Sequence, residues 1–306
     1  MGMTSRQRML TALEGGVPDR LPVTTHHLQD YFRNKYMGGK SDGEIFAALG
    51  LDPIFWTGPY LPDVERGAYF DPTSEEPTNP RFSRRIVTDE WQIQCEPIDN
   101  PRYSTQRCTI ATPKGNLTMV LQSNEYTTWV TEHLVKEKRD IDLIGEFVPA
   151  PLCNVEAVNR QAEAFGEQGL VRGAICGFDL YGQPGTWQDA AVLVGIQELI
   201  LATFDDPAWV HELLEILCRR KETYIRSLAG ARYDLLELGG GDASTTVISP
   251  KIFRKFVAPY DTRLIELAHE AGQRIVYHTC GGMMPILEDI AAMGPDAMET
   301  FTPPDM

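Results

Sequence analysis

Short apolar runs alternate with amphipathic helical patterns from Gly169 to the end of the chain. Each run is four to seven residues long and is bounded by glycine or polar residues, which is typical of buried strands. Such alternation of strands with helices predicts an α/β fold with a parallel sheet. Strands are expected at 170–176, 235–238, 274–278 and 296–301.

The helices between these strands are predicted from apolar residues at the helical period and from their start and stop signals. Asp206-Pro207 begins a long helix that ends at Gly230, and Ser249-Pro250 begins another that ends at Gly272. Pro259 is expected to interrupt the second helix, because proline has no backbone N–H to donate. A shorter helix is expected at 285–294.

The first half of the chain is less regular. A helix is expected over 4–14 and strands over 21–25 and 53–56. Between about 81 and 130 the pattern changes to alternating polar and apolar residues separated by turn-rich stretches. This change predicts an antiparallel insertion over the body of the domain.

The pattern gives six candidate strands for a sheet, whereas a closed (β/α)8 TIM-type barrel has eight. The chain thus predicts either an open sheet or a barrel that lacks its last strand-helix units. The second interpretation is favoured, because 303–306 (PPDM) has the composition of a loop. We expect one domain over 1–306, and its unpaired barrel edges predict that the isolated chain dimerises to a homodimer or aggregates.

Composition and charge narrow the classes of partner. The formal charge of −15 argues against nucleic acid and against an anionic membrane surface. The sequence shows neither a membrane-length apolar run nor a signal peptide, which predicts a cytoplasmic protein. The six cysteines form no Cys-x-x-Cys pair, so a reducing compartment is expected and a disulfide framework is not.

The strongest chemical signal is the pair His278 and Cys280, two residues apart at the end of an apolar run. In an extended segment, residues i and i+2 point to the same side, so an imidazole nitrogen and a sulfur can converge on one metal ion. Zinc accepts this ligand mixture, and catalytic zinc sites keep one position open. The alternative is that His278 makes a local hydrogen bond and Cys280 is a small buried side chain.

In a barrel, catalytic groups lie where strands end and loops begin. Tyr181 follows a strand and could stack on a flat ligand, and Cys176 is expected to be a core residue. The residues that this rule brings to one mouth are His26, His27, Thr57, Cys176, Asp242, His278, Cys280 and Glu299.

Several segments resemble the uroporphyrinogen decarboxylase superfamily, in the same order along the chain. They are RQRML at 6–10, GGVPDRLP at 15–22, SPKIF at 249–253 with Pro259-Tyr260, and HTCG at 278–281. The resemblance implies a (β/α)8 barrel and one of two chemistries. One branch decarboxylates a porphyrinogen without metal, and the other comprises zinc methyltransferases that pass methyl groups to or from a corrinoid.

Two departures from the decarboxylase pattern favour the methyltransferase branch. No arginine occurs between Pro22-Val23 and Arg33, and Phe55-Trp56-Thr57 stands where decarboxylases carry a key aspartate. A polycarboxylate would therefore lack its guanidinium partners.

The methyltransferase resemblance implies His278 and Cys280 as zinc ligands, with a third, a cysteine, expected beyond Met306. Since no Asp-x-His-x-x-Gly motif occurs, the corrinoid (cobalamin) is expected on a separate protein. Asp242 and Glu299 are assigned catalytic roles, and His26, Thr57 and Tyr181 substrate contacts. The alternatives are a decarboxylase that uses Asp242 and a non-catalytic binding protein.

Overall fold

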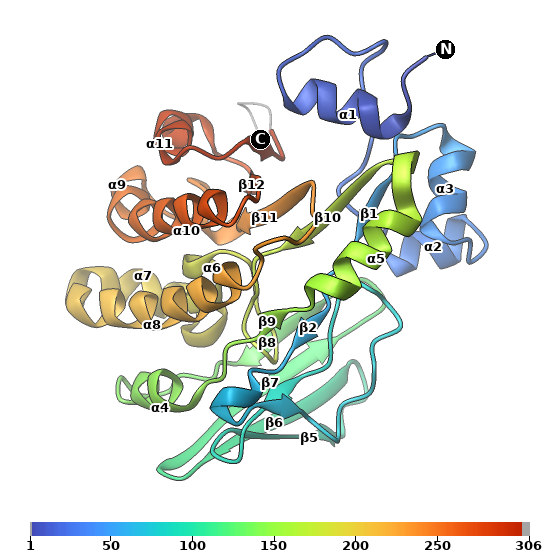
Figure 1. Ribbon diagram of the computed structural model, residues 1–306. Helices are drawn as coiled ribbons and strands as arrows, with labels where there is room; N and C mark the ends of the chain where they lie inside the picture. Colours follow the sequence, from blue (N-terminus) through green and yellow to red (C-terminus); the bar gives the residue numbers. More distant parts are fainter. Residues whose placement is uncertain (1, 302–306) are drawn as a thin grey trace.

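The structure, a computed structural model, describes residues 2–301 and is built on a central sheet of five parallel strands (Figure 1). The α/β class is therefore confirmed. The strands lie side by side in chain order, as in the wall of a (β/α) barrel. They are β1 (Ile54–Trp56), β10 (Leu170–Ala174), β11 (Leu235–Gly239), β12 (Ile275–His278) and β13 (Ala297–Glu299).

The prediction of a strand over 21–25 is wrong. Asp52 occupies the hydrogen-bonding groups of Val23: the Val23 N–H donates to the Asp52 carboxylate at 2.9 Å, and the Asp52 N–H donates to the Val23 carbonyl at 2.7 Å. The segment is thus attached to one buried side chain and does not pair in the sheet. Within residues 2–301 the central sheet is open. Closure of the barrel therefore stays a prediction. The segment 303–306, which was expected to be a loop, lies outside the described residues.

Helices pack beside the sheet (Figure 1), where α6 contacts β11 and α8 packs against α6 and α10. None of the helices in the described part combines the length and apolarity needed to cross a membrane. Their bounds are α1 (Ser5–Leu13), α2 (Asp30–Tyr36), α3 (Asp42–Leu49), α4 (Asp140–Phe147), α5 (Val155–Phe165), α6 (Thr186–Val194), α7 (Ile196–Asp205), α8 (Pro207–Arg226), α9 (Pro250–Ile252), α10 (Ala258–Glu270) and α11 (Leu287–Met293).

The helix predicted to break at Pro259 instead changes its hydrogen-bond pattern. A π-helical turn over Phe253–Val257 joins α9 to α10, and Pro259 lies in the first turn of α10. A π-turn accommodates the missing proline N–H without ending the helix.

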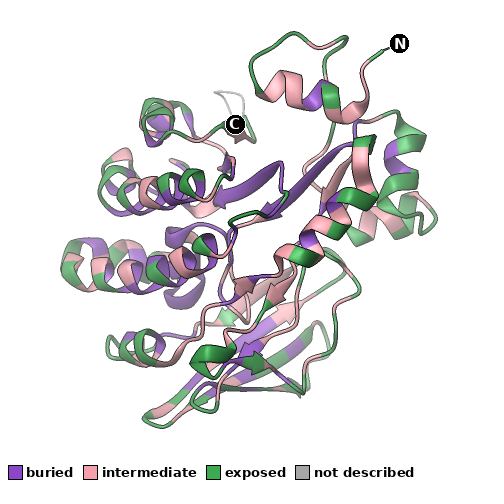
Figure 2. Cartoon of the chain, viewed as in Figure 1, coloured by how far each residue is buried: buried purple, intermediate pink, exposed green. Residues whose placement is uncertain are grey.

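The sheet has one apolar face. Leu236 and Tyr277 are fully buried, and the Tyr277 hydroxyl donates to Asp261 of α10 at 2.7 Å. Figure 2 shows β10 and β11 as largely buried. Beneath the loop after β10, the buried Lys221 ammonium donates to Asp189 at 2.6 Å and to the carbonyl of Cys176 at 2.7 Å. This buried ion pair holds the start of the loop against α8.

A separate four-stranded antiparallel sheet occupies the region where alternation was predicted. The Cys95 and Cys108 sulfurs are bonded across its first two strands, where the two residues pair in register, so the expectation that the cysteines stay unpaired is wrong for these two. The other cysteines are free. The strands are β5 (Gln92–Ile98), β6 (Ser104–Thr112), β7 (Gly115–Ser123) and β8 (Thr128–Glu132).

Two short antiparallel pairs complete the strands of the described chain. They are β2 (Tyr60–Leu61) with β9 (Leu152–Cys153), and β3 (Tyr69–Phe70) with β4 (Ile86–Val87). Figure 1 shows β2 and β9 between the two larger sheets.

Candidate functional site

A polar cluster covers the face of the central sheet opposite the apolar one. Register places Trp56 beside Arg172, and His278 beside both Gly239 and Glu299. Because side chains alternate along each strand, Glu237 projects on the same side as Gly239. These side chains therefore meet on one face: Trp56, Arg172, Glu237, His278 and Glu299.

Arg172 joins the two carboxylates of this cluster. Its guanidinium donates to Glu237 at 2.8 Å and to both carboxylate oxygens of Glu299, one of them at 2.7 Å. Arg172 and Glu237 are 3% and 5% exposed, so these pairs are shielded from water. A charge-assisted bond is strong in such surroundings, but it requires every partner to be present.

Both carboxylates have lowered pKa values, which favours their ionised forms. Burial acts to raise the pKa of Glu237, but the hydrogen bond from His26 and the charge of Arg172 outweigh it and lower the pKa. Burial likewise opposes ionisation of Glu299, yet hydrogen bonds from His278 and Arg172 bring its pKa down to about 2.

His26 reaches the cluster from the extended segment before α2. Its Nε2 donates to Glu237 at 2.8 Å, and its ring stacks on that of His278 with centroids 5.3 Å apart. The neighbouring His27 lies beside it, with the two Nδ1 atoms 2.6 Å apart, at hydrogen-bond distance. Burial, together with the charge of His26, lowers the pKa of His27 to about 4.

His278 has one nitrogen on each side of the cluster. Its Nδ1 donates to Glu299 at 3.0 Å, and its Nε2 lies 3.2 Å from the Cys280 sulfur. Burial acts to lower the pKa of His278, but the hydrogen bonds to Cys280 and Glu299 outweigh it and raise the pKa to about 10. The structure therefore brings together the imidazole and sulfur that the sequence pattern singled out.

A second set of potential ligands shares His278 with this pair. His26, Glu237, His278 and Glu299 each offer one atom, and these atoms lie within 4.8 Å of one another. The cluster thus contains a group of side chains able to hold a metal ion. Glu237 and Glu299 are already paired with Arg172, so an ion among the four would compete with that guanidinium.

Trp56 forms the floor beside the cluster. Its indole N–H donates to the His26 carbonyl at 2.7 Å. Two guanidinium carbons lie near its ring centroid, that of Arg172 at 4.5 Å and that of Arg81 at 4.4 Å. These contacts are at cation–π distance.

The remaining predicted site residues lie outside this network. Asp242 accepts a hydrogen bond from the Gln188 amide at 2.6 Å. Thr57 is buried and its hydroxyl bonds to Gln161. The Tyr181 hydroxyl donates to the Thr128 carbonyl at 2.8 Å. Cys176 is fully buried, as expected of a core residue.

Sequence reasoning missed Arg172, Glu237 and Arg81. The first two stand alone as charged residues inside apolar strand segments, LVRGA and LLELG. A charge in a buried strand needs a partner, and this was a usable signal. Arg81 carried no such signal, because it follows a turn-rich stretch.

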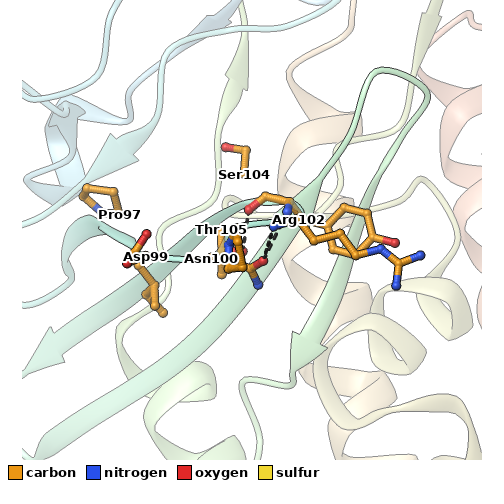
Figure 3. A pocket seen from close by; sticks show the side chains of 9 residues that line it. Pro97, Asp99, Asn100, Arg102, Ser104 and Thr105 are labelled. Carbon is orange, nitrogen blue, oxygen red and sulfur yellow. Dashed lines mark hydrogen bonds between the residues drawn. The ribbon is translucent and has the colours of Figure 1, made fainter.

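A hollow at the turn between β5 and β6 lies apart from these residues. Figure 3 shows its lining, residues 97–105, none of which belongs to the polar cluster. Asn100 organises the turn by accepting hydrogen bonds from the backbone N–H groups of Arg102 and Tyr103 at 2.9 and 3.1 Å. The hollow is thus accounted for by turn geometry.

Comparison with known proteins confirms the resemblance seen in the motifs. Residues 180–302 match the family model of uroporphyrinogen decarboxylase (URO-D). This segment contains Glu237, His278, Cys280 and Glu299.

Uroporphyrinogen decarboxylases from two strains of Thermus thermophilus are 32% and 30% identical to the chain over 95 residues. Each match covers 31% of this chain and 27% of the relative, so the chain matches about a quarter of the length of these curated relatives.

A solved structure described as a methyltransferase from Methanosarcina mazei has a similar fold. The match has a TM-score of 0.50 with 16% sequence identity, and it covers 97% of this chain and 75% of that one. At this identity the likeness concerns the fold. Over residues 180–302 the chain thus resembles the uroporphyrinogen decarboxylase family, and its α/β fold resembles that of the methyltransferase.

Proposed function

We propose that the full-length protein is a zinc-dependent methyltransferase that moves a methyl group between a small methylated substrate or thiol and a corrinoid carried by a separate protein. The observation that carries this proposal is the approach of His278 Nε2 to the Cys280 sulfur, 3.2 Å apart at the end of β12. This is one half of a mixed nitrogen and sulfur site.

The donor set fits zinc. Bonds of about 2.0–2.1 Å to nitrogen and about 2.3 Å to sulfur in a tetrahedral arrangement place the two ligand atoms about 3.5 Å apart. The observed separation is close to this value. Glu299 accepts the Nδ1–H of His278, which leaves Nε2 directed at Cys280 and fixes the imidazole. A carboxylate commonly orients a zinc-bound histidine in this way.

The Cys280 side is favoured over the four-residue group around Glu237. Arg172 already neutralises the carboxylates of that group, and an ion placed there would face the guanidinium. At the Cys280 side, His278 Nε2 and the Cys280 sulfur face each other with no guanidinium paired to either among the described residues. The family resemblance implies a third ligand, which is expected beyond Met306.

Zinc, when bound, would act as a Lewis acid that favours the thiolate of an acceptor or makes the heteroatom of a methyl donor a better leaving group. The chain's own side chains do the positioning. Glu299 holds His278, and Arg172 holds Glu299. Asp242 lies in the loop after β11 and is hydrogen-bonded to Gln188 of α6. It remains a candidate for contact with substrate.

A decarboxylase acting on a porphyrinogen is the less well supported alternative. Of the two guanidinium groups beside Trp56, that of Arg172 is already paired with two glutamates. A substrate with many carboxylates requires several free guanidinium groups. Metal-free turnover of a porphyrinogen would favour the alternative.

Chelation should abolish methyl transfer. We expect the full-length protein to move a methyl group between a methylated corrinoid protein and small thiols, and a chelator that strips zinc to lower the rate by about 100-fold or more. Restored zinc should restore the rate. Unchanged activity in protein shown by elemental analysis to be metal-free would contradict the proposal.

Gly239→Ala should weaken metal binding through the backbone of β12. Gly239 has φ +98°, and a Cβ there would lie 2.5 Å from the His278 carbonyl oxygen, so the substitution must move that residue. Gly230→Ala is a matched control, because its φ is +82° but its surroundings are open. The positive φ should cost each variant about 1 kcal/mol of stability, and the close contact adds to this cost in Gly239→Ala. Only Gly239→Ala should lose about tenfold or more in zinc affinity; equal affinities would show that the backbone contact does not matter.

A further inference from the structure

The guanidinium of Arg81 is a half-buried cation without an anionic partner. Within residues 2–301, no carboxylate lies at ion-pair distance from it and no acceptor at hydrogen-bond distance. Its contacts are with aromatic rings, those of Trp56 at 4.4 Å and Phe82 at 6.0 Å. Because the side chain is partly exposed, its N–H groups can donate to a ligand from solution.

The backbone at Arg81 is held in place. Its N–H donates to the Asn79 side chain at 3.0 Å, and the Gly58 N–H donates to the Pro80 carbonyl at 2.9 Å. A Cβ on Gly58 would lie 2.8 Å from the Arg81 carbonyl oxygen, so this close approach requires glycine. The loop after β1 and the segment 79–82 thus fix the arginine at the carboxyl end of the sheet.

The carboxylates near Arg81 are engaged by other residues, which leaves its guanidinium available to a ligand. The nearby carboxylates, Glu237 and Glu299, already accept hydrogen bonds from other residues. These donors are Arg172, His26 and His278. Burial, with the charge of Arg172 also acting against the cation, lowers the pKa of Arg81, although both glutamates oppose the change. The two glutamates therefore compensate this cation only in part, and an anion from solution could pair with it directly.

We propose that Arg81 binds the carboxylate of a small substrate whose sulfur or other heteroatom lies at the His278 and Cys280 site. This inference rests on the proposed function and names its substrate class as small carboxylic acids. Trp56 supplies a flat wall beside the guanidinium, and Arg81 donates two N–H groups to the carboxylate. The overall charge of −15 disfavours anions in general, so selectivity depends on this one side chain.

The test compares two probes that differ in one group. 3-Mercaptopropionate and 3-mercapto-1-propanol are titrated calorimetrically into the zinc-loaded full-length protein. The acid should bind about tenfold more tightly than the alcohol, as expected for a charged hydrogen-bonded pair. The preference should disappear in Arg81→Met and be partly retained in Arg81→Lys.

Arg102→Met is the matched control. Arg102 also lies on an aromatic ring, with its guanidinium carbon 5.0 Å from the Tyr103 centroid, but it is exposed in the loop shown in Figure 3. The control should keep the full preference for the acid. Equal binding of acid and alcohol to the wild type, or an unchanged preference in Arg81→Met, would overturn the assignment.

Failure of the zinc proposal can be distinguished from failure of this one. Metal content is measured first, and a protein that binds no zinc contradicts the proposed function. Propionate and 1-propanol are then compared in the same way, because neither needs a metal. A preference for propionate that depends on Arg81 would support the carboxylate site, and its absence would reject it.

Discussion

Replacing His278 with alanine and Cys280 with serine should leave the full-length protein without zinc. The wild type is expected to hold about one zinc ion per chain. Loss of residues that only orient a ligand costs about 10–100-fold in metal affinity, so loss of two ligands should exceed that range. Elemental analysis after dialysis measures the outcome, and circular dichroism shows whether the variant is folded.

Two further variants make this experiment specific. His269→Ala removes another histidine that bonds to a carboxylate, Asp296 at 2.9 Å, but on α10 and away from the cluster, so zinc should be retained. Glu299→Gln keeps both proposed ligands and should reduce affinity by about 10–100-fold while one zinc per chain is still reached at saturation. Full zinc in the double variant would rule out the site.

Arg172→Met should destabilise the fold by about 3–5 kcal/mol, because it leaves two carboxylates near each other with one cation removed. Glu237 is the more affected, since it is 5% exposed. Urea unfolding measures this loss as a lower midpoint with an unchanged slope.

The deficit of the Arg172 variant should depend on pH. Arg172 helps to lower the pKa values of Glu237 and Glu299 below those of an unfolded chain. This contribution is present above about pH 4.5 and is lost as pH falls towards 2, so the two proteins should converge in acid.

A neutral partner should also reduce the deficit. Arg172→Met combined with Glu237→Gln should recover part of the lost stability. Arg107→Met is the control, because it removes an exposed arginine 4.0 Å from Glu132. This substitution should change the free energy of unfolding by less than about 0.5 kcal/mol. A loss below about 1 kcal/mol in Arg172→Met would contradict a stabilising role for the ion cluster.

The C-terminal half of the fold could be predicted because its local signals agree. The apolar runs at β10, β11 and β12 are short and bounded by glycine, and Pro207 in the first turn of α8 follows an Asp206 N-cap whose side chain accepts the Trp209 N–H at 3.2 Å. The strand prediction for 21–25 was wrong, because the hydrogen bonds of this segment depend on a residue distant in sequence. Only Asp52, remote in sequence, decides that Val23 bonds to a side chain.

The candidate site was predicted in part for the same reason. The spacing of His278 and Cys280 is a local property of one strand, and the structure brings their ligand atoms together. The links from Glu237 to His26 and Arg172 join separate strands and a loop, and no local pattern encodes such contacts. The pairing of Cys95 with Cys108 likewise depends on the register of β5 and β6.

The attachment of the first twenty residues to Asp52 has a practical consequence. This buried carboxylate accepts hydrogen bonds from Ser5, Arg8 and Arg20 as well as from Val23, and the last of these anchors the segment that carries His26 to the cluster. Arg20 is itself partly accessible, with 45% of its side chain exposed. Trypsin cleavage at this residue would release part of the anchor, so purified material should be checked for clipping by mass spectrometry before its chemistry is compared between preparations.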